Sequence, residues 1–139
     1  MMSRKVVITI NDTHIVDGQK ETAKLSTVGK YEQRENGYLL TYQETEDFKG
    51  SETTVSFIDG VVTMKRLGGK HNAQLIVEPG KRYSCMYATE YVDLMLGVHG
   101  KEVKSRVGTD EGELFFSYTL DFNTGFCSHN ELKITFRFE

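Results

Sequence analysis

The sequence LFFSYTLDF at residues 114–122 places a large apolar side chain at every even position. The odd positions are polar except for Phe115. Successive side chains of a β-strand point to opposite faces of the sheet, so a strand with one buried face shows this alternation. The stretch therefore predicts a half-buried strand, with these residues facing a core: Leu114, Phe116, Tyr118 and Leu120.

The same two-residue period recurs along most of the chain. Residues 132–138 alternate apolar and polar side chains, which adds Ile134 and Phe136 to the predicted core. Weaker copies of the pattern cover residues 6–10, 38–42, 55–57, 62–64, 75–77, 83–87 and 92–98. No stretch of about a dozen residues carries the competing apolar stripe of an amphipathic helix. We therefore predict an all-β protein.

Short turn motifs separate these segments. Asn36-Gly37 and Asp59-Gly60 are typical of two-residue hairpins, in which both central residues need a positive φ. Pro79-Gly80 suits the centre of a type II turn. Further glycine-containing breaks lie at Gly68-Gly69, Asp110-Glu111-Gly112 and Asn123-Thr124-Gly125.

Turns at such short intervals indicate how the strands are connected. They imply about nine or ten strands joined as consecutive hairpins, with no room for the helical crossovers that parallel strands need. A sheet of that many strands curls or closes, since closure removes its exposed edges. We predict a single domain over residues 1–139, an antiparallel up-and-down (meander) β-barrel of about eight to ten strands, in preference to a two-layer sandwich.

The composition excludes several classes of protein. The chain has 139 residues, a net charge of −3, 38% hydrophobic and 27% charged residues, which is ordinary for a globular domain. This charge gives no reason to expect nucleic acid as a partner. The N-terminus lacks the apolar run of a signal peptide, and no stretch approaches the ~20 apolar residues of a membrane span. With two widely separated cysteines, these features predict a cytoplasmic protein with reduced thiols and no membrane partner.

Candidate catalytic and metal-binding motifs fail on spacing. The four histidines are scattered, without the spacing of a shared metal site. Residues 68–70, Gly-Gly-Lys, lack the earlier glycine and the following Ser or Thr of a phosphate-binding loop. Cys127 and His129 share one face of a strand, but no orienting group or oxyanion hole accompanies them. We predict no enzymatic activity, no metal and no cofactor.

Six of the seven tyrosines fall on the more apolar phase of their strands: Tyr31, Tyr38, Tyr42, Tyr83, Tyr87 and Tyr118. An inward tyrosine brings a hydroxyl group that needs a hydrogen-bond partner. Such hydroxyls can line a cavity and orient a bound molecule. The alternative is a filled core whose hydroxyls reach the barrel ends or one another. A barrel of about eight strands permits either arrangement.

A modest basic stretch occupies residues 65–82, with a single acid, Glu78, among its cations: Lys65, Arg66, Lys70, Lys81 and Arg82. One interpretation is an anion site, for a phosphorylated or carboxylated ligand or for RNA. The other is a solvated rim that neighbouring acids balance. The sequence alone leaves both open.

Residues 80–98 and the closing strands resemble the YwiB-like family of small bacterial β-barrels. The resemblance is carried by Gly80, Arg82, Tyr87, Thr89, Tyr91 and residues 94–98, 116–120 and 130–134. It implies a lipocalin-like (calycin-type) barrel from the cytoplasm of a Gram-positive bacterium. It implies no established activity and no known site.

The leading functional expectation is a barrel that binds a small amphipathic or anionic ligand in its interior or at its mouth. The residues expected to contact the ligand are Arg82, Tyr83, Tyr87, Tyr118 and Tyr42. Arg82 lies on the opposite strand phase from Tyr83 and Tyr87, so it joins them only if a bulge or strand end turns it inward. The alternative is a protein- or RNA-interaction module that acts through its outer surface. This alternative includes a homodimer.

Overall fold

Ten antiparallel β-strands make up the part of the chain that the computed structural model describes, which is residues 3–45, 49–122, 125 and 127–139, without the side chain of Cys127. The strands are β1 (Ser3–Val16), β2 (Gln19–Arg34), β3 (Gly37–Gln43), β4 (Glu52–Ile58), β5 (Val61–Leu67), β6 (Asn72–Val77), β7 (Arg82–Ala88), β8 (Asp93–Val107), β9 (Glu111–Asp121) and β10 (Cys127–Phe138).

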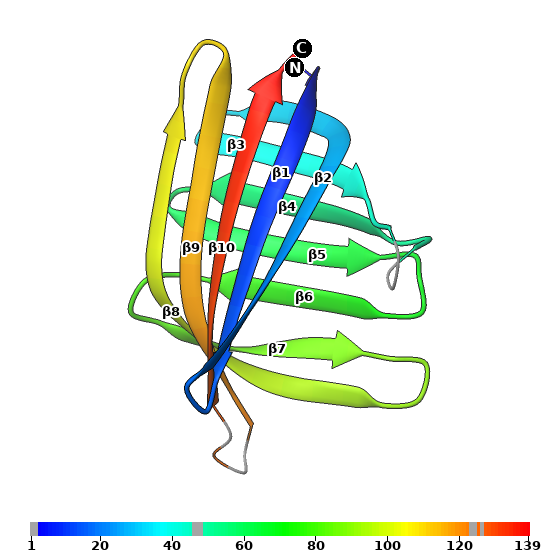
Figure 1. Cartoon of the computed structure of the whole chain (residues 1–139), viewed down its shortest axis with the longest axis vertical. Helices are drawn as coiled ribbons and strands as arrows, with labels where there is room; N and C mark the ends of the chain where they lie inside the picture. The colour runs from blue at the N-terminus through cyan, green and yellow to red at the C-terminus, as the bar shows by residue number, and fades with distance from the viewer. Residues whose placement is uncertain (1–2, 46–48, 123–124, 126) are drawn as a thin grey trace.

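The strands close into a barrel in the order β1-β10-β9-β8-β7-β6-β5-β4-β3-β2. Each strand pairs with the next along the chain, and β1 closes the barrel against β10. The predicted antiparallel meander barrel is therefore confirmed. In Figure 1, β1, β9 and β10 run along the long axis, β3 to β7 run across it, β8 bends from the second direction into the first, and the two termini lie side by side at one end.

Two of the predicted turns are confirmed, and two are displaced: the one at Asn36-Gly37, and the one at Asp110-Glu111-Gly112, whose last two residues already belong to β9. Asp59 and Gly60 have φ values of 52° and 81°, as a two-residue hairpin of this type needs. Gly80 has a φ of 80°, and the Lys81 amide donates to the Glu78 carbonyl, which closes the predicted type II turn. Gly37, in contrast, is the first residue of β3, after a turn one residue earlier than predicted.

The glycine at position 37 serves close packing rather than the turn. A Cβ atom at this position would collide with the backbone carbonyl of Phe57 on β4. The residue type is therefore required by the approach of two strands. Of the predicted loop at 123–125, Asn123 and Thr124 lie outside the described residues.

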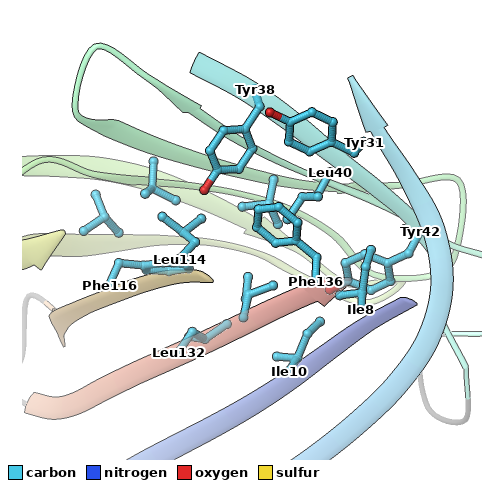
Figure 2. Packing of buried hydrophobic residues seen from close by; sticks show 14 of the residues in the cluster. Ile8, Ile10, Tyr31, Tyr38, Leu40, Tyr42, Leu114, Phe116, Leu132 and Phe136 are labelled. Atoms are coloured by element: carbon cyan, nitrogen blue, oxygen red, sulfur yellow. The ribbon is translucent and has the colours of Figure 1, made fainter. Parts of the chain in front are cut away.

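Aromatic side chains of the core pack together at the end of the barrel where the termini lie, and Figure 2 shows part of this core. Tyr31 stacks against Tyr38 with ring centroids 5.3 Å apart and meets Phe138 edge-on at 5.0 Å. The Tyr38 hydroxyl is satisfied by the Ser105 hydroxyl at 2.6 Å. At this end, therefore, the interpretation of the tyrosines as filled core is the correct one.

The predicted core residues on β9 and β10 are buried, with one exception. Leu114, Phe116, Tyr118, Ile134 and Phe136 are at most 6% exposed. Leu120 is only half-buried because it lies at the wall of an internal cavity.

Candidate functional site

A cavity of about 310 Å³ occupies the half of the barrel away from the termini. Its walls come from seven strands, β1, β5, β6, β7, β8, β9 and β10, which contribute apolar and polar side chains around one hollow. The lining residues are Asp12, His14, Met64, Arg66, Ala73, Gln74, Leu75, Cys85, Met86, Tyr87, Leu96, Tyr118, Leu120 and Leu132.

Strands β6 and β7 are paired over only part of their length beside the cavity. Registered pairing of these two strands is confined to Asn72↔Ala88 and Ala73↔Tyr87, at one end of the ladder. Two lining residues, Gln74 and Met86, are exposed and alternate with inward-facing neighbours, so they belong to the outer phase of their strands. The wall of the cavity therefore includes the seam between β6 and β7 as well as the barrel interior.

An inward-facing arginine forms part of the polar end of this cavity. Arg66 follows Val62 and Met64 on the core-facing phase of β5. Its Nε lies 3.5 Å from Oε2 of Glu44, and the two side chains are only 17% and 7% exposed. Thr53 donates its hydroxyl to the same Glu44 oxygen at 2.6 Å. The result is a largely buried ion pair with a hydrogen bond that fixes its carboxylate.

A second polar group comes from the end of β1. Nε2 of His14 lies 3.3 Å from Oδ2 of Asp12. On its other side, Nδ1 of His14 meets Oδ1 of Asn130, whose amide donates to the Ser128 hydroxyl at 3.1 Å. An amide oxygen can only accept, so Nδ1 of His14 donates this hydrogen bond, while Nε2 faces Asp12.

Burial dominates the electrostatics of the acidic and phenolic groups here. It raises the pKa of Asp12, while the His14 and Arg66 charges act in the opposite direction. The buried Oδ1 atom of Asp12 has no hydrogen-bond partner among the described residues. Burial also raises the pKa of Tyr118, which the Asp12 charge raises further and the Arg66 charge lowers. These couplings place Asp12, Arg66 and Tyr118 around the same space.

The structure separates the five residues that the sequence suggested as ligand contacts. Tyr87 and Tyr118 line the cavity. Tyr42 is buried, and its pKa is raised by burial first and then by the charge of Glu44, with Arg66 lowering it. Tyr83 is half-buried and donates its hydroxyl to Glu78 at 2.7 Å; it is absent from the described cavity lining.

The expectation that Arg82 shares a pocket with the tyrosines is wrong. Arg82 is exposed on the outer face of β7, where Nε and Nη2 contact the two carboxylate oxygens of Asp121 at 3.1 and 2.6 Å. The pair lies across Gly97, where a Cβ atom would collide with both side chains. Arg82, the first residue of β7, therefore points outward as its position in the strand alternation predicts, and no bulge turns the side chain inward.

Sequence reasoning missed the polar residues that do reach the cavity. Arg66 was grouped with a surface charge stretch, although its spacing from Val62 and Met64 places it on the inward phase. Asp12 and His14 likewise continue the inward phase of Val6, Ile8 and Ile10. The sequence signal for these residues is the two-residue alternation of the strand, which continues beyond its last apolar residue.

The basic stretch is balanced by acids. Four of its five cations contact a carboxylate: Arg66 with Glu44, Lys70 with Glu90, Lys81 with Glu78, and Arg82 with Asp121. The interpretation as a rim balanced by neighbouring acids therefore describes three of these pairs, and the Arg66 pair belongs to the cavity.

Other candidate chemistry is sparse. No cluster of three or more His, Cys, Asp or Glu side chains suited to a metal ion occurs in the described ranges. His129 lies 3.2 Å from Glu131, and the side chain of Cys127 is outside the described part of the chain. The described residues include no helix with the length and hydrophobicity of a membrane span.

Fold and cavity together define a ten-stranded up-and-down β-barrel with a partly polar internal hollow. The family model for a domain of unknown function (DUF1934) matches residues 8–134, and the chain belongs to this family. It is 25% identical over 121 residues to the uncharacterized β-barrel protein YwiB of Bacillus subtilis (strain 168), covering 86% of this chain and 84% of that protein.

A solved structure shows the same fold. The crystal structure of the ywiB protein from Bacillus subtilis superposes with a TM-score of 0.88 at 20% identity, over 99% of this chain and 93% of that chain. The resemblance to YwiB-like barrels is therefore confirmed.

Proposed function

We propose that this barrel binds a small amphipathic molecule in the cavity at the end away from the termini. The observation that carries the proposal is the division of the cavity wall. Apolar and aromatic side chains form most of the lining, and the polar groups Asp12, His14 and Arg66 are part of the same wall. Ligand sites in proteins share this design, in which apolar walls supply affinity and a few polar groups set orientation.

The volume supports a ligand of modest size. The cavity measures about 310 Å³, at the lower end of the roughly 300–1,000 Å³ typical of small-molecule sites. An apolar cavity of about 150 Å³ already holds benzene. An alkyl chain such as that of octanol suits the space, with its hydroxyl at the polar end.

The test is calorimetric titration with octanol of the parent protein and of two matched variants. Ala73 lines the cavity and Ser84 is exposed on the neighbouring β7, so Ala73→Phe fills the hollow while Ser84→Phe adds the same ring outside it. We expect saturable binding that Ala73→Phe weakens at least about tenfold, a change of about 1.4 kcal/mol. Binding that is absent, or equal in both variants, would contradict the proposal.

A second candidate is self-association through the outer face of the β7–β8 hairpin. Met86 and Met95 are cross-strand partners, and both are more than half exposed. Tyr91, at 89% exposure, and Val92 extend this apolar surface to the turn. Exposed apolar clusters of this kind are typical of interaction sites.

Light scattering after size-exclusion chromatography tests this second candidate. A dimer that Met95→Lys converts to a monomer would support it, and a monomer at all concentrations would exclude it. An enzyme activity is not proposed, and the cytoplasmic location stays a prediction that cell fractionation can test.

A further inference from the structure

The charges at the polar end of the cavity do not balance. Arg66 is the permanent cation of this part of the cavity, His14 beside Asp12 is charged only when protonated, and two carboxylates, Asp12 and Glu44, lie around them. Glu44 is the contact partner of Arg66, with Nε and Oε2 3.5 Å apart, so the arginine charge is engaged before any ligand arrives. The remaining carboxylate, Asp12, lies against His14, with Nε2 and Oδ2 3.3 Å apart.

Asp12 is also poorly supplied with hydrogen-bond donors. A carboxylate has about four acceptor sites, and an isolated buried charge is costly unless it is paired. Oδ1 is buried without a partner among the described residues, and Oδ2 has the 3.3 Å contact to His14. The side chain lines the cavity and is 32% exposed, so a molecule in the hollow can approach the carboxylate.

A cationic head group would relieve both deficits, because its charge offsets the carboxylate and its N–H groups donate. Building on the proposed function, we infer that the cavity selects amphipathic amines over carboxylates of the same chain length, with Asp12 as the residue that sets this preference. A carboxylate ligand would instead meet two acids and an arginine already held by one of them. This reverses the anionic ligand that the sequence suggested.

The experiment compares three ligands with one alkyl chain: octylamine, octanol and octanoate. At neutral pH the amine is charged, as a lysine side chain is, and the carboxylic acid is ionised. Calorimetric titration of the parent protein is expected to rank octylamine first and octanoate last, with about a tenfold difference between them. The neutral alcohol reports binding to the cavity without a head-group charge.

Two variants identify the source of the preference. Asp12→Asn keeps the shape of the side chain and removes its charge, so the tenfold preference for the amine should disappear. Asp121→Asn is the matched control, because Asp121 contacts Arg82 on the outer face. It should leave the ranking unchanged.

Circular dichroism shows whether Asp12→Asn folds. If it does not, Arg66→Gln tests the same inference independently. Removing the cation leaves the site more acidic, so octylamine should bind more tightly than to the parent protein. If Arg66 anchored anions instead, octanoate would bind more weakly and the affinity for octylamine would not rise. Octanoate binding as tightly as octylamine to the parent protein would overturn this inference and leave the proposed function standing. Failure of all three ligands to bind would overturn both.

Discussion

His14 Nε2 lies 3.3 Å from Oδ2 of Asp12, while the other oxygen of the same carboxylate is buried without a hydrogen-bond partner in the described structure. The barrel thus holds an acid that is only half satisfied, at the wall of a cavity rather than in the packed core. Buried polar groups in proteins are normally paired, and exceptions mark functional or strained positions. The predictions below follow from this arrangement and from the packing around it.

Asp12→Asn should stabilise the protein at neutral pH. Burial raises the pKa of Asp12 in the folded state, so folding favours the protonated acid. This contribution to stability is fully present below the unfolded pKa of about 3.9 and is lost as the pH rises through the folded value. Urea unfolding at pH 7 should therefore show Asp12→Asn above the parent, with the difference shrinking towards about pH 4.

Asp121→Asn is the control, because its effect on stability at neutral pH should have the opposite sign. Its hydrogen bond with Arg82 lowers the pKa of Asp121, so this carboxylate stabilises the fold above its unfolded pKa and loses that effect as the pH falls. The variant should be less stable than the parent at pH 7 and equal to it in acid. Matching pH profiles for the two variants would contradict the account of Asp12.

Asn130→Ala should destabilise the barrel by about 1–3 kcal/mol, since buried partners lose their hydrogen bonds. Asn130 is 1% exposed and links His14 to Ser128. Urea unfolding measures the loss, with Gln19→Ala at an exposed position as the control. A loss below about 0.5 kcal/mol, the size of an ordinary surface substitution, would show that the link is not structural.

Tyr38→Phe should shift alkaline unfolding. Burial raises the pKa of Tyr38 to about 12. Folding stability therefore falls as the pH rises above the unfolded value of about 10 and through the folded value, and the phenylalanine variant lacks this contribution. At pH 7 the free energy of unfolding of the variant should be about 1 kcal/mol lower than that of the parent, because the hydrogen bond to Ser105 is missing. Its deficit should then shrink or reverse above pH ~10.

The control for this titration is Tyr91→Phe, at a tyrosine that is 89% exposed. It should follow the parent at every pH. A constant deficit for Tyr38→Phe from neutral to alkaline pH would show that ionisation of this phenol does not contribute.

The seam between β6 and β7 should exchange its amide hydrogens early. Registered pairing there is limited to two residue pairs, whereas β1 and β2 pair over their whole shared length from Ser3↔Glu32 to Val16↔Gln19. Local opening costs least where few backbone hydrogen bonds must break. Hydrogen exchange followed by mass spectrometry should show weaker protection over residues 74–77 and 82–86 than over residues 6–10. Equal protection would mean that the seam is closed in solution.

The two-residue period predicted the barrel because every strand must bury one face. The same logic missed β2, whose exposed half from Gln19 to Lys24 carries almost no apolar residues. Asp17-Gly18, with φ values of 51° and 76°, marks the hairpin before it and uses the same dipeptide as Asp59-Gly60. That turn was therefore readable from the sequence.

The site was only partly predictable. Tyr87 and Tyr118 line the cavity, and both lie on the apolar phase of their strands. Which inward residues face a hollow and which face packed core depends on how seven distant strands converge, and no local pattern reports that. The loss of pairing between β6 and β7 has no sequence signal that we can identify.

The central claim is that a small amphipathic molecule occupies the cavity, and NMR of the methyl groups during titration with octylamine tests it most directly. The account predicts saturable shifts for cavity leucines, Leu75, Leu96 and Leu132, with the exposed outer residues Val28 and Val107 unchanged. Shifts confined to Val28 and Val107, or no saturable shift at the three leucines, would contradict it.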